Sequence, residues 1–419
     1  MSRRRSPSPR RAAEQTIEHR ILLTATLCLL AGGAVMVYSA SSARTLLAGQ
    51  GDGTMYLVKY LTYGALGFVA LHLATRVNLD AVRRLTPGLL GVAFFLCVLV
   101  KVPGVGVEVN GATRWLGAGP VQFQPSELMK LALVLYAVHL LALRPQIVSS
   151  VREIVSPLLL VVGAAAILIA SQPDLGTALV CTFVVAALVI AAGMPMRVLG
   201  ILGGSAVGAI MLFALAAPYR RARLTSFLDP WAHAGDAGFQ SVQGQIALGS
   251  GGVFGKGLGE SVQKIFYLPE AHTDFILAVI GEELGVAGVL GLLFLYGLIA
   301  YAGLRVAKSA RGPYAQLLAA GVTSLILCQA LLNVFTVLGL APLTGVPLPF
   351  ISSGSSSLLI LLTAMGLLLN VAGGGRSDLK AVRGPNRARS GNGASGGHRS
   401  GGDGGTRRAG ARSGRRAAG

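Results

Sequence analysis

The sequence predicts an all-α polytopic membrane protein, and three observations lead to this fold class. Of the 419 residues, 53% are hydrophobic and only 13% are charged. The hydrophobic residues gather in runs, and about ten of these runs are long enough to cross a bilayer as helices. The net charge of +19 comes largely from basic residues near the two ends of the chain. Together these features are typical of a membrane protein.

The predicted spans follow one another through short connections, except before the eighth span, where a long loop covers residues 218–273. We expect the spans at residues 21–39, 56–75, 87–102, 126–143, 156–170, 177–193, 198–217, 274–304, 314–340 and 356–371. The first run imitates a secretory signal, but it has the length of a full span and many spans follow it. Residues 21–373 therefore form the predicted membrane domain, between tails at 1–20 and 374–419.

Both tails are basic and poor in residues that could build a core, so we expect them to be disordered. In a membrane protein such tails face anionic lipid, which we prefer to binding of nucleic acid. The cysteines, Cys28, Cys97, Cys181 and Cys328, lie inside apolar runs and lack metal-ligand spacing.

An even number of spans puts both termini on one side of the membrane. The short loops on that side carry Arg76, Arg83, Arg84, Arg144, Arg152, Arg197, Arg305, Lys308 and Arg311. Because positive charge is enriched in cytoplasmic loops, both termini are predicted to be cytoplasmic. Two outer loops break this rule, with Arg114 in residues 103–125 and a second group in residues 218–273. This second group is Arg220, Arg221, Arg223, Lys256 and Lys264.

The cations of these outer loops have two interpretations. They indicate an anionic ligand on the outer face, or a long loop that escapes the charge bias. Both alternatives stay open at this point.

Residues 267–275 place Glu270, His272 and Asp274 where the long loop meets the eighth span. Placing a carboxylate near lipid costs about 2.5–3.5 kcal/mol of insertion free energy at a helix centre and less at an interface. An aspartate at position 274 therefore indicates a functional or structural role. We take Asp274 as the candidate catalytic group. His272 is either part of the site or a hydrogen-bonding structural residue.

Other polar residues also lie at the predicted outer ends of spans. Glu127 and Lys130 are three residues apart and share one helix face. We interpret them as a structural ion pair or as residues that contact the substrate. Asp174 either caps the helix that starts near Thr177 or contributes to the site. The glycine-rich residues 249–259 fail the phosphate-loop pattern. Three prolines within residues 342–356 predict irregular backbone that packs against protein or lines a cavity.

Several of these segments resemble the SEDS family (shape, elongation, division and sporulation), nearest to its division type. The resemblance covers about residues 21–371, and it rests on Tyr-Leu-Pro-Glu-Ala-His-Thr-Asp-Phe at 267–275, Ile-Gly-Glu-Glu-Leu-Gly at 280–285, Gln-Pro-Ser-Glu-Leu at 124–128, Gln-Pro-Asp-Leu-Gly-Thr at 172–177 and Pro-Leu-Pro-Phe-Ile-Ser at 347–352. The chain departs from the family pattern at Ser353, where the family has an aromatic residue, and at Ser355, where it has glycine.

The resemblance implies a membrane glycosyltransferase that polymerises lipid II into a nascent glycan strand outside the bacterial cytoplasmic membrane. It also implies a class B penicillin-binding protein as partner, other divisome proteins and a position at the division septum. The family's essential aspartate matches Asp274, and its polar cavity residues match Arg114, Glu127, Lys130 and Asp174.

The chemistry then gives each group a role. Asp274 would accept the proton of the acceptor hydroxyl. Lys130 and Arg114, with Lys256, Lys264 or the arginines at 220–223, would stabilise the departing pyrophosphate. A divalent cation could assist there, although no ligand cluster demands one.

The competing hypotheses are a lipid II flippase and a scaffold that only activates its partner. A flippase should carry polar groups through the whole depth of its spans, or paired broken helices at the midplane. Here the charges gather at the outer end, which favours catalysis.

Overall fold

The computed structural model describes residues 9–374, apart from residues 48, 50–52, 110, 119–120, 216–220, 222–224, 237 and 266. Within these ranges eight helices are long and apolar enough to cross a membrane, and two shorter apolar helices, Leu175–Ala191 and Met196–Gly208, accompany them. Each of the ten corresponds to a predicted span. The prediction of an all-α polytopic membrane protein is therefore confirmed.

The spans are built from the following elements. They are α1 (Pro9–Leu47), α2 (Met55–Ala74), α3 (Leu79–Leu99), α4 (Pro125–Leu143), a continuous span of α5 (Val151–Ile154), a π-helical turn (Val155–Leu159) and α6 (Leu160–Ala170), then α7 (Leu175–Ala191), α8 (Met196–Leu215), α11 (Ile276–Ser309), α12 (Pro313–Val337) and α13 (Ser355–Ala372). A 3-10 turn, Pro145–Ser149, joins α4 to α5.

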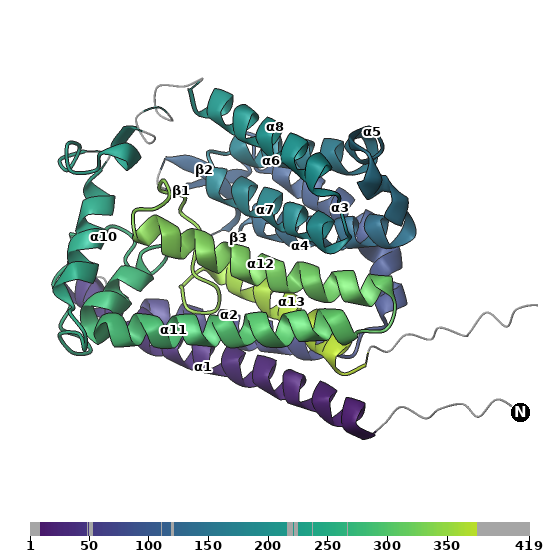
Figure 1. Ribbon diagram of the computed structural model, residues 1–419. Helices are drawn as coiled ribbons and strands as arrows, with labels where there is room; N and C mark the ends of the chain where they lie inside the picture. The colour runs from purple at the N-terminus through teal and green to yellow at the C-terminus, as the bar shows by residue number, and fades with distance from the viewer. Residues whose placement is uncertain are drawn as a thin grey trace, which may run out of the picture. The chain divides into compact units, whose positions relative to one another are not determined.

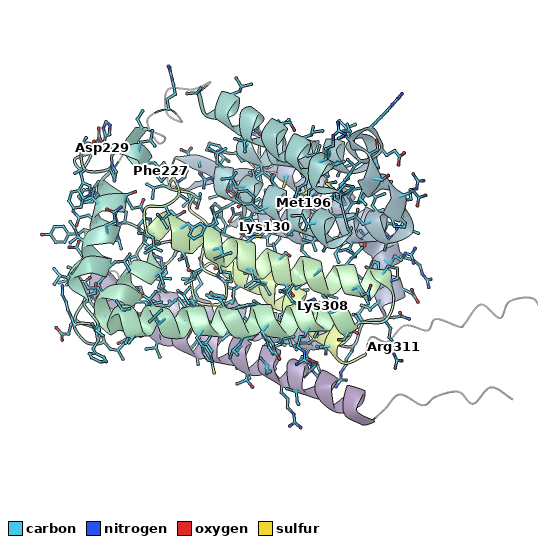
Figure 2. The ribbon with its side chains drawn as sticks, in the orientation of Figure 1. Lys130, Met196, Phe227, Asp229, Lys308 and Arg311 are labelled. Atoms are coloured by element: carbon cyan, nitrogen blue, oxygen red, sulfur yellow. The ribbon has the colours of Figure 1, made fainter. Side chains whose placement is uncertain are left out.

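The connections predicted to face outward gather at one end of the bundle. Figure 1 shows the strands and α10 (Phe239–Ser250) at the end opposite to the start of α1. Figure 2 shows Lys308 and Arg311 near that starting end of α1, and Phe227 and Asp229 at the other end.

Three helices form the interior of the bundle. In the most apolar 18-residue windows of α13, α12 and α4, 89%, 78% and 67% of the residues are buried, against 22% in α2, α3 and α11. The enclosed helices α4 and α12 carry the buried polar side chains Glu127, Lys130, Gln329 and Asn333. In contrast, α2, α3 and α11 expose apolar surface, as lipid-facing helices do.

The second outer loop contains a small antiparallel sheet that the sequence analysis did not predict. Its strands are β1 (Gly106–Val109), β2 (Ala112–Ala118) and β3 (Val121–Phe123), in the order β1-β2-β3. Gly106 pairs with Leu116, and Leu116 pairs with Phe123. The sheet gives the backbone of this loop its hydrogen-bond partners and presents Arg114 from β2.

The predicted bounds of the first and third spans differ most from the structure. The first helix runs over Pro9–Leu47 rather than over residues 21–39, and Ala12, Ala13, Glu14 and Gln15 near its start are good helix formers. The third helix begins at Leu79, because the Asn78 side chain accepts a hydrogen bond from the Asp80 N–H at 2.9 Å and caps it. Pro87, the predicted start, lies inside that helix.

Candidate active site

Asp274 lies just before α11, with a side chain of intermediate exposure. The Thr273 hydroxyl donates to its Oδ1 at 3.2 Å. Its main-chain carbonyl accepts a hydrogen bond from Asn333 Nδ2 of α12 at 2.7 Å. The main chain that carries this carboxylate is therefore fixed by an interior helix.

Residues 341–354 form an irregular segment between α12 and α13, and side chains of the bundle satisfy its carbonyl groups. The carbonyls of Val346, Pro347, Pro349 and Phe350 accept from Asn333, Gln329, Tyr296 and Tyr60 at 2.8, 2.9, 2.5 and 2.6 Å. The prediction of irregular backbone packed against protein is confirmed here.

The same segment passes beside the Asp274 carboxylate. Gly345 has a φ of +66°, and a Cβ atom placed on it would lie 3.9 Å from Asp274 Oδ2. Glycine therefore provides both the left-handed backbone and an open flank next to the carboxylate.

Glu127 and Lys130 of α4 form the predicted ion pair. Lys130 Nζ lies 2.8 Å from Glu127 Oε2, and the two side chains are only 1% and 2% exposed. Lys130 also donates to Gln329 Oε1 at 2.6 Å, and Figure 2 places it among the helices of the bundle. Because Gln329 in turn holds the Pro347 carbonyl, the pair supports the segment beside Asp274. A direct contact of either residue with substrate stays a prediction.

Asp174 caps α7, as one of the two sequence interpretations stated. Its Oδ1 accepts from the Thr177 N–H at 3.2 Å, and its Oδ2 accepts from Gln124 Nε2 and Ser126 Oγ, both at 3.0 Å. This carboxylate fastens the start of α4 to the start of α7.

Arg114 lies on the neighbouring strand β2 and binds the loop just before Asp174. Its Nε donates to the Gln172 carbonyl at 3.0 Å, and its Nη2 donates to the Pro173 carbonyl at 2.5 Å. Gly176 brings this loop against the segment beside Asp274, since a Cβ there would collide with the Thr344 carbonyl. The structure thus gathers the residues around Arg114, Asp174 and Asp274 at one end of the bundle.

Lys256 and Lys264 pair with the two glutamates of α11. Lys256 Nζ lies 2.8 Å from Glu282 Oε1, and Lys264 Nζ lies 2.7 Å from Glu283 Oε1. The Ser39 hydroxyl of α1 lies 2.8 Å and 2.7 Å from the two oxygens of Glu283. In this structure both lysines fasten the long loop to the bundle.

The remaining candidate site residues are His272 and the arginines of residues 220–223. His272 is buried, and its ring lies 4.1 Å from the Tyr56 ring of α2, measured between centroids. Its carbonyl accepts from the Ser353 N–H at 3.0 Å. Arg220 and Arg223 lie outside the described residues, whereas Arg221 is described and exposed.

A cavity of about 480 Å³ is lined by Lys101, Glu108, Gln172 and Pro173, among other residues. Asp274 is not among its lining residues. In the described ranges, no three His, Cys, Asp or Glu side chains are grouped as metal ligands.

This geometry can be compared with known proteins. Residues 19–376 match the family model of the cell cycle proteins FtsW, RodA and SpoVE. The chain belongs to this family.

Curated relatives match this family member over almost their whole length. The stage V sporulation protein E of Bacillus subtilis is 38% identical over 359 residues, which cover 86% of this chain and 98% of the relative. The probable peptidoglycan glycosyltransferase FtsW of Geobacter sp. strain M18 is 40% identical over 352 residues, covering 84% and 96%.

Solved structures of the FtsW/RodA/SpoVE family match its fold. A chain from a peptidoglycan synthase complex, described as coordinating polymerization and crosslinking, superposes with a TM-score of 0.70 at 31% identity, over 84% of this chain and 96% of that one. The rod shape determining protein RodA of Thermus thermophilus gives a TM-score of 0.62 at 30% identity, over 84% and 95%.

The sequence analysis did not identify Gln329 and Asn333, the two amides of α12 that bind the site. They are four residues apart and therefore lie on one face of the helix. Amides inside a long apolar run are costly unless they are hydrogen-bonded. That spacing is the signal that could have identified them.

Proposed function

We propose that this member of the family is a peptidoglycan glycosyltransferase that polymerises lipid II into glycan strands during cell division. The reaction takes place on the outer face of the bacterial cytoplasmic membrane. The observation that carries the proposal is the placement of Asp274, a carboxylate of intermediate exposure whose main chain is fixed by Asn333 of α12. The names of the FtsW relatives support the reaction class.

Asp274 acts as the general base. The 4-hydroxyl oxygen of the acceptor sugar attacks the anomeric carbon of the donor and forms the new glycosidic bond. The bond from that carbon to the diphosphate breaks, and its electron pair leaves with the phosphate oxygen. Asp274 takes the hydroxyl proton, a contribution of about 10²–10⁴ in rate. Because the diphosphate is already a good leaving group, the reaction does not need the second, acidic carboxyl of a glycosidase.

In this proposal Arg114 binds the diphosphate of the donor. Its two hydrogen bonds go to neutral carbonyls, whereas Lys130, Lys256 and Lys264 each neutralise a carboxylate. Lys130 and Lys264 are buried with their partners, and removing one partner from a buried ion pair costs about 3–5 kcal/mol, so binding of a diphosphate by these two lysines would be expensive. In this proposal Glu127 and Lys130 act through Gln329, which holds the segment beside Asp274.

The test is a purified Asp274→Asn variant supplied with lipid II. We expect polymer formation to fall by about 10²–10⁴, the value of a general base. The matched control is Asp229→Asn, an exposed aspartate of the same long loop, which should polymerise normally. Polymer at the wild-type rate from Asp274→Asn would reject the base role.

The same preparation separates the enzyme from a flippase. In proteoliposomes a flippase would move lipid II across the bilayer without forming polymer. An enzyme forms polymer from lipid II that is already in the outer leaflet.

A class B penicillin-binding protein is the partner that fits this reaction, since new strands must be cross-linked. The fold match to a chain from a peptidoglycan synthase complex supports such a partner. The division septum and contacts with other divisome proteins also belong to the proposal. So do the cytoplasmic termini.

A further inference from the structure

The helix α11 is interrupted near its outer end, and the long loop supplies backbone hydrogen bonds around the break. Gly285 adopts φ 68° and ψ −165°, which no helix contains. The Lys256 and Gly257 N–H groups donate to the carbonyls of Glu282 and Glu283, both at 3.0 Å. Residues 256 and 257 are therefore bonded to the turn of α11 that precedes the break.

The turn formed by residues 252–255, here called the tip, continues this contact. The N–H groups of Val286 and Ala287 donate to the carbonyls of Gly252 and Val253, both at 3.0 Å. These bonds fix the level of the tip along α11. Figure 1 shows the loop that follows α10 beside the first turns of α11.

The depth of the break follows from the length of α11. Arg305 is the first charged residue toward its other end, and Gly285 precedes it by twenty positions. At about 1.5 Å per residue these twenty residues span about 30 Å, the thickness of the hydrocarbon core. Tilt of α11 would place the break deeper in the bilayer. The tip therefore lies at the outer boundary of the hydrocarbon.

The side chains of the tip are apolar and point away from the protein. Phe254 is 84% exposed, and Val253 is also exposed. Below the tip, α11 exposes Val286, Leu290 and Phe294, which are spaced by four residues along one face. The exposed apolar surface is thus continuous from the lipid-facing stripe of α11 to the tip.

The lysine next to the tip is neutralised within the protein. Lys256 follows it directly and pairs with Glu282, whose other oxygen accepts from the Ser261 hydroxyl at 2.6 Å. A paired charge crosses the interface at lower cost than a free one, so the tip can enter lipid without carrying an unpaired ammonium with it.

We propose that Val253 and Phe254 insert into the outer leaflet of the bilayer and anchor the long loop to the membrane surface. The occupant of this patch is the lipid acyl region and not another protein chain. Since Lys264, Glu282 and Glu283 connect the same loop to α11, the anchor sets the height of the segment that carries Asp274. The lipid contact itself does not depend on the proposed enzymatic activity.

Tryptophan fluorescence of the full chain in vesicles tests this. Phe254→Trp adds a reporter to the two native tryptophans, Trp115 and Trp231. The control is Leu228→Trp, which is 75% exposed in the same long loop. Its neighbours in the sequence, Phe227 and Asp229, are labelled at the outer end of the bundle in Figure 2. Both emission spectra are read as differences from the unmodified protein, in vesicles that contain no other protein.

We expect the tryptophan at position 254 to emit at shorter wavelength than the one at position 228. Lipids brominated near the glycerol end of their chains should quench it about threefold more strongly, as an interfacial residue requires. Val253→Trp is a second reporter and should behave in the same way. Water-like emission at both tip positions, quenched by iodide and not by brominated lipid, would overturn the proposal and assign the patch to a protein partner.

Discussion

The environment of Asp274 depends on a residue that has no side chain. Gly345 passes the carboxylate with φ +66°, and a Cβ there would lie 3.9 Å from Oδ2. That distance allows a methyl group but removes the room for a hydroxyl or water on this flank. Proton transfer needs the acceptor hydroxyl within about 2.6–3.2 Å of the base, so the open flank bears directly on the chemistry.

We expect Gly345→Ala to lower the rate of polymerisation by about tenfold, corresponding to about 1.4 kcal/mol. Gly312→Ala is the matched control, because Gly312 also has a positive φ, +86°, with open space around its Cβ position. The measurement is the initial rate from purified lipid II. Equal losses in both variants would mean that backbone strain alone explains the effect.

Arg114 gives a second prediction for a single residue. Arg114→Gln removes the charge, and we expect a loss of about 10²–10³ in polymerisation, the range for a group that stabilises developing negative charge. Arg114→Lys keeps the charge but lacks the planar fork that reaches the Gln172 and Pro173 carbonyls, so its loss should be intermediate. Arg311→Gln, at the other end of the bundle in Figure 2, should have wild-type activity. Full activity of Arg114→Gln would contradict the assignment.

Among the elements, the broken helix α11 explains why two glutamates occur in an apolar run. Glu283 receives the Lys264 ammonium and the Ser39 hydroxyl, and both Glu283 and Lys264 are buried. The pair closes the segment of residues 265–282, in which Asp274 lies midway. A buried charge whose partner is removed is far more costly than the absence of both.

We therefore expect Lys264→Met to lower the free energy of unfolding by about 3–5 kcal/mol, because it leaves the buried Glu283 carboxylate without its cationic partner. The double variant Lys264→Met/Glu283→Gln should recover much of that loss. Thermal unfolding in detergent measures both, and Lys308→Met, at an exposed lysine of the same helix, should change stability by less than about 0.5 kcal/mol. A double variant no more stable than the single one would show that the pair does not act as a unit.

Hydropathy predicts the spans of this protein but not the structure of its loops. The ten spans were identified because a bilayer demands long apolar runs. The sheet formed by β1, β2 and β3 and the helix α10 were missed, since a search for spans does not examine water-exposed loops for short periodic patterns. The break at Gly285 was missed because its stabilising bonds come from residues about 30 positions away, which local patterns do not report.

The location of the candidate residues was predictable to a similar degree. Asp274 and Asp174 were singled out as charged groups near span ends, and Arg114 as a cation of an outer loop. The structure places all three at one end of the bundle, and their roles stay predictions. The pairing of Lys256 and Lys264 with Glu282 and Glu283 needed the fold, because neither pair has helical spacing. From the sequence alone, where these partners are not apparent, both lysines are predicted to be cations of the outer loop that could bind an anion.

At the scale of the whole molecule, the bundle has two chemically different ends. One end carries the site residues, and the other carries Lys308 and Arg311 (Figure 2). Arg83, near the start of α3, and Arg144, just after α4, follow the positive-inside pattern. The proposed function requires the end with Asp274 to face outward, where lipid II is polymerised.

Labelling of single cysteines in spheroplasts tests this orientation. Asp229→Cys should react with a membrane-impermeant maleimide, and Lys308→Cys should react only after the membrane is opened. The four native cysteines lie in apolar helices, so they should give little background with a polar reagent. Figure 2 places the two substituted positions at opposite ends. The reverse labelling pattern would put Asp274 in the cytoplasm and refute polymerisation on the outer face. Labelling of both positions in closed spheroplasts would instead mean that the spheroplasts leak. Release of a cytoplasmic marker protein checks this independently.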